Sequence, residues 1–272
     1  MVVVDFHIHV YPCYDIGKLL RYAYANLSRV VAVTGVGGIS HQRVLCLTER
    51  SECQFFNEAV GCADSLYRYG DWSVSKTADD NALLLRTPAG EELWIINGRQ
   101  ISSAERLEVL ALVADRQLGG AWKDGTPAKE LIASINASGG IAVLNWAPGK
   151  WSGGRGEIIR GLIENASAGE VSLSETSLRA SRIAPHKLIE LGRQKGLRIF
   201  CGSDPLPFVG EERSAGIYAM TLEGSLDRDK PATWLRRAIK GGAALKPVSL
   251  SRPALPILYR LLRNEVSRRL GC

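Results

Sequence analysis

Two of the four histidines of the chain stand one residue apart in the stretch "VVVDFHIHVYP", residues 2–12. The apolar run before them predicts a strand, and alternate side chains of a strand point to the same face, so Asp5, His7 and His9 share one side. Two imidazoles with that spacing can reach one divalent ion, while the acid orients a ring or joins as a ligand. The alternative is a pair of core histidines satisfied by hydrogen bonds, but two histidines and an acid are costly to bury unpaired. We therefore expect His7 and His9 to bind a metal.

Other acids follow apolar runs in the same way. Asp204 ends the strand-like "RIFCGSD", where it is a metal ligand, a base for a metal-bound water, or only a turn or helix-capping residue. Glu175 in "VSLSETS" and Glu49 in "VLCLTER" occupy similar positions. In a barrel the carboxyl ends of the strands converge, and active sites gather there. We expect these acids to complete the metal site.

A glycine-rich segment, "NWAPGKWSGGRGE", joins a predicted strand to a predicted helix. Its backbone amides at the helix start, together with Lys150 and Arg155, suit a phosphate or carboxylate. Two alternatives stay open: a merely flexible loop, or an aromatic wall for a ring or sugar built from Trp146 and Trp151. We expect a small anionic substrate, with Lys150 and Arg155 as its contacts.

Strand-like and helical segments alternate along the chain, which favours a parallel sheet with crossover helices. Six or seven such units in 272 residues predict a single α/β domain over residues 1–272, a TIM-like (β/α)7 barrel that is possibly distorted. The segment "RLEVLALV" reads as a strand, and "NALLLRTPAGEELWII" as two strands joined by a Pro-Ala-Gly turn. Residues 252–270 predict a closing amphipathic helix with a solvated basic face.

Composition indicates a protein of the cytoplasm. No apolar stretch reaches the roughly 20 residues of a membrane span, and the first residues lack a signal-peptide pattern. The six cysteines form no C-x-x-C pair, so we expect reduced thiols, with Cys13 closest to the histidines. The net charge of +6 is partly due to arginines of the closing helix, and nucleic acid or membrane contact is not indicated beyond that weakly basic helix.

These motifs resemble the PHP (polymerase and histidinol phosphatase) family of metal-dependent phosphoesterases. The similarity rests on "DFHIH" near the start, "GSD" after a late strand, "IINGRQI", and "GGIAVLNWAPGKW", with "LEVLAL" and "SLSETS" in matching order. The resemblance implies a (β/α)7 barrel that holds two or three Zn, Mn or Fe ions at strand ends.

The chain departs from the family pattern at three places. Gln100 stands where the pattern has Glu, Asn145 where it has the His of His-Pro, and Pro205 and Leu206 where another His follows Gly-Ser-Asp. His41 and His186 stand at positions unsuited to replace the missing imidazoles. Since amide oxygens bind transition metals more weakly than carboxylate and imidazole, we expect one divalent ion, Zn, Mn or Fe.

Three functions stay open from the sequence. The first is a phosphoesterase that acts through a metal-activated water. The second is an amidohydrolase-type hydrolase of a C–N or lactone bond, and the third is an inactive barrel with a binding or regulatory role, which Gln100 and Asn145 favour.

Overall fold

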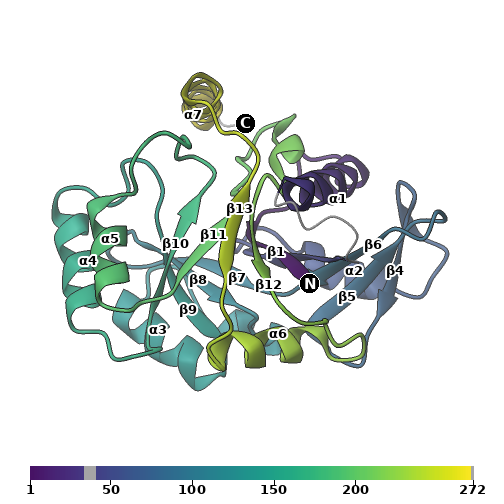
Figure 1. Ribbon diagram of the computed structural model, residues 1–272, viewed down its shortest axis with the longest axis horizontal. Helices are drawn as coiled ribbons and strands as arrows, with labels where there is room; N and C mark the ends of the chain where they lie inside the picture. The colour runs from purple at the N-terminus through teal and green to yellow at the C-terminus, as the bar shows by residue number, and fades with distance from the viewer. Residues whose placement is uncertain (34–40, 271–272) are drawn as a thin grey trace.

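The computed structural model describes residues 1–33 and 41–270, and its largest sheet has eight strands (Figure 1). At its centre, β1 lies parallel to β2, which lies parallel to β6; the outer neighbours run antiparallel. In spatial order the strands are β13 (Lys246–Ser249), β12 (Tyr218–Leu222), β1 (Val2–Ile8), β2 (Gln42–Leu47), β6 (Glu92–Ile96), β5 (Ala82–Arg86), β4 (Trp72–Lys76) and β3 (Arg68–Tyr69).

A second sheet of five strands faces the first. Three of them, β11, β10 and β9, are parallel, and two antiparallel strands follow. Their order is β11 (Ile199–Gly202), β10 (Ser172–Thr176), β9 (Ile141–Asn145), β8 (Glu108–Leu112) and β7 (Arg99–Ser102). The strand predicted in "RLEVLALV" is thus confirmed as β8.

The two sheets meet along two seams and enclose a common core. On one side, Glu49 forms an isolated parallel bridge with Arg99; on the other, the Asp204 amide donates to the His7 carbonyl at 2.9 Å. Large side chains fill the space between them, among them Phe6, Trp94 and Phe200.

The α/β class is confirmed, but a closed (β/α)7 barrel is not, because the ladders among the described residues form two sheets. Short turns account for part of the difference: the predicted hairpin around the Pro-Ala-Gly turn, β5–β6, pairs antiparallel, whereas a crossover helix allows parallel pairing.

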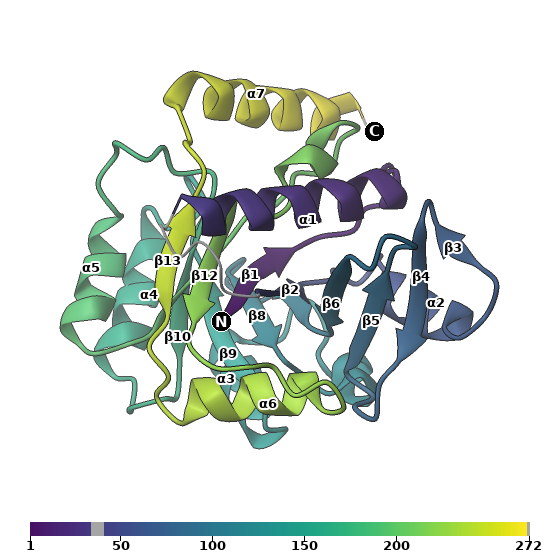
Figure 2. The ribbon, with the colours of Figure 1, turned by 45° about the vertical axis from the view of Figure 1, so that its right-hand side comes forward.

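Helices cover the outer faces of both sheets (Figures 1 and 2). Leu19, Leu20 and Leu27 of α1 pack in one outer cluster, and α3, α4 and α5 pack in another against β9 and β10. The helices that precede the C-terminal helix in the chain are α1 (Ile16–Ala32), α2 (Phe55–Cys62), α3 (Ala128–Ala137), α4 (Gly154–Glu164), α5 (Lys187–Gln194) and α6 (Pro231–Lys240). Two short 3-10 helices are η1 (Arg116–Ala121) and η2 (Glu211–Ser214). None of the helices in the described ranges is long and apolar enough to cross a bilayer.

Helix α7 (Ala254–Leu270) lies apart from the sheets at the top of the molecule (Figure 2). The expected solvated basic face is only partly present. Arg252 and Arg260 are both 7% exposed, and Arg260 pairs with Glu211 of η2 through contacts of 2.8–3.0 Å. Apolar side chains such as Leu255 and Leu262 are exposed, while Arg260 turns inward to the buried Glu211 carboxylate. The side chains of Arg268 and Arg269, like Cys272, lie outside the described residues.

Candidate metal centre

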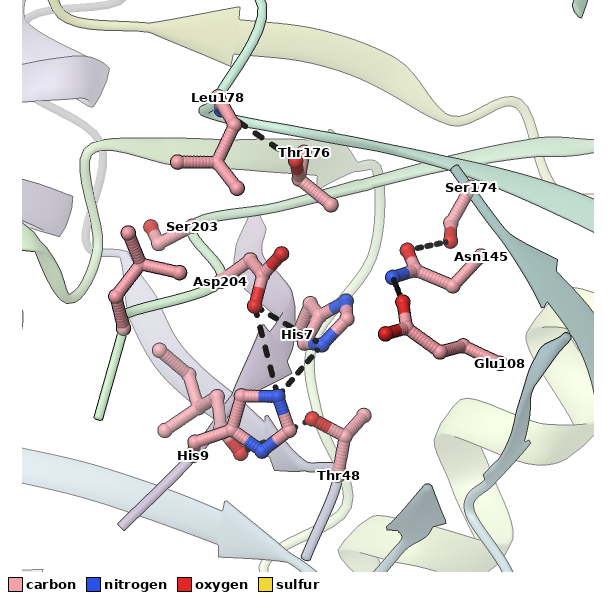
Figure 3. Close-up of polar contacts among 12 residues, drawn as sticks. His7, His9, Thr48, Glu108, Asn145, Ser174, Thr176, Leu178, Ser203 and Asp204 are labelled. Carbon is pink, nitrogen blue, oxygen red and sulfur yellow. Dashed lines mark hydrogen bonds and ion pairs between the residues drawn. The ribbon is translucent and has the colours of Figure 1, made fainter. Parts of the chain in front are cut away.

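Three buried side chains direct their ligand atoms toward one point (Figure 3). The Nε2 atoms of His7 and His9 are 3.0 Å apart, and Oδ1 of Asp204 lies 3.5 Å from each of them. The three atoms lie within 4.8 Å of one another, a spacing that a single ion can bridge. The structure thus brings together the two histidines and the one aspartate that the sequence placed at strand ends.

The seam between β1 and β11 holds this geometry. His7 is in β1, His9 follows its end, and Asp204 follows β11 by two residues. A Cβ placed on Gly202 would lie 2.3 Å from the His7 Cβ, so only glycine allows the two backbones to approach this closely. Asp204 itself has a φ of 49°, a left-handed conformation that costs about 1–3 kcal/mol in a non-glycine residue. The hydrogen bond from its amide to His7 helps to hold that conformation.

Asp5 supports the site from behind rather than joining it. Its Oδ1 accepts from the amides of His7 (3.1 Å) and Ser203 (2.9 Å), and its Oδ2 accepts from the amide of Gly216 (3.0 Å). Burial raises the pKa of this carboxyl to about 7, although these hydrogen bonds oppose the rise. Asp5 therefore fixes the backbone next to Asp204 and is neither a ligand nor in contact with a histidine ring among the contacts described.

The charge states suit a cation. Burial lowers the pKa of His7 to about 4, although the Asp204 carboxylate opposes the change, so its ring is neutral at pH 7. Burial alone would raise the pKa of Asp204, but His7, His9 and Arg260 together lower it to about 2. A carboxylate oxygen and imidazole nitrogens that converge in a buried site form a donor set typical of Zn or a related divalent metal. The residues present fit one ion.

A cavity of about 360 Å³ opens beside the cluster. His9 and Asp204 line it, together with Tyr11, Arg50, Gln100, Glu108 and Lys150 and, from α7, Leu261, Asn264 and Ser267. Helix α7 thus forms one wall of the cavity, and the volume of the cavity suits a small molecule.

Glu108 is the residue that sequence reasoning missed. Its Oε2 accepts from Asn145 Nδ2 at 3.0 Å (Figure 3). Its Oε1 pairs with Lys150 Nζ at 3.1 Å. The Asn145 Oδ1 accepts from the Ser174 hydroxyl at 2.7 Å, so both polar atoms of this amide are engaged. Glu108 is the first residue of β8, whereas the candidate ligands predicted from the sequence all lie at or near the carboxyl ends of strands.

Gln100 lines the same cavity but differs from Asn145 in its bonding. Its Oε1 is buried without a hydrogen-bond partner among the described residues. This amide oxygen is thus available to a group in the cavity.

The structure places Glu49 and Glu175 outside the cluster. Glu49 Oε1 accepts from the Phe56 amide at 3.1 Å, at the start of α2. Glu175 accepts from the Arg179 guanidinium and, at 2.7 Å, from the Tyr218 hydroxyl. Each carboxylate already has partners on the outer side of its strand, and neither belongs to the group that could hold an ion.

Arg155 and Cys13 neither belong to the cluster nor line the cavity beside it. Arg155, in the first turn of α4, donates to the Gly149 carbonyl at 3.0 Å. Cys13 is exposed, and all five cysteines of the described residues are free thiols. His186 caps α5 through its Nδ1, and His41 precedes β2, as their sequence positions suggested.

No family model matches the sequence, and no curated protein matches it either. Several solved structures resemble the fold, among them the following two. PsfC from Pseudomonas syringae PB-5123 has 16% sequence identity and a TM-score of 0.55, with 99% of this chain and 98% of PsfC covered. The lesion-specific endonuclease PfuEndoQ from Pyrococcus furiosus has 11% identity and a TM-score of 0.52 over 90% of this chain, which spans 57% of that enzyme. At such identities the likeness shows a shared fold.

Proposed function

We propose that the protein is a metal-dependent hydrolase that cleaves phosphoesters of small molecules with one divalent ion. The observation that carries this proposal is the convergence of His7, His9 and Asp204 in a buried site beside an open cavity. The fold likeness to an endonuclease, an enzyme that cleaves phosphodiesters, supports it. The "DFHIH" and "GSD" motifs that supply the three ligands further support a distant relationship to the PHP phosphoesterases.

The side chains that line the cavity have different roles in the proposed reaction. A divalent ion held by His7, His9 and Asp204 would supply Lewis-acid chemistry toward a phosphoryl oxygen and a water molecule. Lys150 and Arg50 line the cavity and provide positive charge for the anionic group, while Glu108 fixes the position of Lys150. In this proposal Arg50 takes the place that the sequence suggested for Arg155.

The ligand set defines the expected cofactor. Two imidazoles and one carboxylate suit Zn, Mn or Fe, and the unpartnered Oε1 of Gln100, which lines the same cavity, could add a weak ligand. We propose a single-domain enzyme, because β1, at the start of the chain, pairs with β12, near its end, in one sheet. Its location in the cytoplasm stays a prediction from the sequence.

Metal analysis of the purified protein tests the proposal. Wild type should bind about one equivalent of Zn, Mn or Fe, as two-histidine, one-carboxylate sites do. The double variant His7→Ala, His9→Ala should bind none, whereas the control His41→Gln, outside the cluster, should bind as wild type does. Stoichiometric metal in the double variant would refute the ligand assignment.

A non-catalytic binding protein is the second candidate, and one observation favours it. Metal-bound histidines usually donate their other ring nitrogen to an acceptor, but the Nδ1 atoms of His7 and His9 have no hydrogen-bond partner among the described residues. Less than about a tenth of an equivalent of metal, with no gain when metal is added, would favour this candidate over the site of a working hydrolase. If metal binds, the rates at which the protein hydrolyses a generic phosphomonoester and a generic ester or amide are compared. Faster cleavage of the phosphomonoester indicates a phosphoesterase, and faster cleavage of the ester or amide indicates an amidohydrolase-type enzyme.

A further inference from the structure

An apolar hollow of about 450 Å³ lies under α7. Its walls include Trp146, Ile183, Ile257 and Leu258, and its polar members are Arg179 and His186. Arg179 is committed to Glu175 and to backbone carbonyls, and His186 caps α5. The hollow therefore offers contact surface for hydrocarbon and little for a charged group.

The apolar hollow adjoins the cavity beside the metal ligands. Pro148, Leu178 and Leu261 line both spaces, and Leu178 and Leu261 belong to one small apolar cluster. The anionic end of a ligand in the cavity would thus have an apolar space next to it. Helix α7 contributes Leu261 to both spaces.

We propose that the substrate is amphiphilic: a phosphate monoester whose alkyl or aryl group lies in the apolar hollow. This inference rests on the proposed hydrolase function and names its substrate class. Ile183 is 57% and Leu258 53% exposed, so a bound tail would remove apolar surface from water. Burial of one methylene is worth about 0.8 kcal/mol, which corresponds to about a fourfold gain in affinity per carbon.

A series of alkylphosphonates, from methyl to octyl, provides non-hydrolysable probes. Titration calorimetry on the metal-loaded protein should give a Kd that falls by about fourfold per methylene until the hollow is filled. Hydrolysis of the matching alkyl phosphates should show the same dependence in kcat/KM.

Two variants of α7 form a matched pair. Leu258→Asp places a charge in the hollow and should remove the dependence on chain length, while methylphosphonate still binds. Leu255→Asp changes a residue that is 77% exposed and lies outside both cavities, so the dependence should remain.

The outcomes separate the two proposals. Binding that is independent of chain length, with one equivalent of metal bound, overturns the amphiphilic substrate and leaves the hydrolase. Absence of both metal uptake and phosphonate binding overturns the hydrolase and the inference together. If Leu258→Asp only converts a dimer into a monomer, as seen by sedimentation, and the length dependence persists, a second copy of the chain occupies the hollow and the inference is wrong.

Discussion

Replacement of Gly202 by alanine tests whether the seam between β1 and β11 builds the metal centre. The added methyl group would lie 2.3 Å from the His7 Cβ and 2.4 Å from the His7 amide nitrogen. Carbon atoms in contact stay about 3.5–4.0 Å apart, so the two backbones must separate by more than 1 Å. The atoms nearest to the added methyl group are the Cβ, amide nitrogen and Cα of His7, so a change of side-chain rotamer cannot relieve the clash.

We expect this separation to weaken both stability and metal binding. Overpacking of this kind costs about 1–3 kcal/mol. Loss of the hydrogen bond from the Asp204 amide to the His7 carbonyl, 2.9 Å long, adds about 1 kcal/mol. Asp204 would move away from the histidines with the backbone, so affinity for the metal should fall as well.

Urea unfolding and metal titration measure the two effects. Gly161→Ala is the matched control, because this glycine lies inside α4 with nothing within 4 Å of an added Cβ. That change should stabilise the helix by about 0.5–1 kcal/mol. If Gly202→Ala unfolds at the wild-type urea concentration and binds one equivalent of metal, the seam does not hold the ligands.

Three further predictions concern charges near the site. Glu49 has a pKa that burial raises from 4.5 to about 7, so the unfolded chain loses this proton first and stability falls as pH rises from about 4.5 to 7. Glu49→Gln should therefore be more stable than wild type at pH 8 by up to roughly 3 kcal/mol, and equal to it at pH 4, as thermal unfolding at the two pH values can check. Arg260→Ala leaves the Glu211 carboxylate buried without its ion pair and should cost about 3–5 kcal/mol in urea unfolding; a cost below about 1 kcal/mol contradicts a buried pair. Lys150→Gln should raise KM for a phosphomonoester about tenfold through loss of a charged hydrogen bond, whereas exposed Lys187→Gln should leave it unchanged.

The sequence predicts the metal ligands better than their surroundings. His7, His9 and Asp204 could be found because strand periodicity and strand ends are local features that a single sequence carries. The expected parallel pairing is present in β1, β2 and β6 and in β9, β10 and β11, but the distance between the histidines and Asp204 depends on the seam where β1 and β11 of the two sheets meet.

The parts that escaped prediction depend on contacts between distant segments. The antiparallel pairing of β1 with β12 joins Val2 to Leu222, and the fit of Gly202 against His7 requires knowledge of both backbones at once. Glu49 looked like a ligand from its position after β2, but the helix that it caps begins only six residues later. Likewise, nothing local to α7 shows that Arg260 turns inward, because its partner Glu211 is in another element.

The hydrogen bond between Asp5 and the Ser203 amide joins residues 198 positions apart in the chain. Closing so long a loop costs conformational entropy before any contact compensates for it, and contacts of high sequence separation form late in folding. The helices and the local hairpins can therefore form while the two halves of the metal site are still far apart. An ion that needs His7, His9 and Asp204 together cannot act as an early folding nucleus here; it can be captured only by a chain whose two sheets have already met.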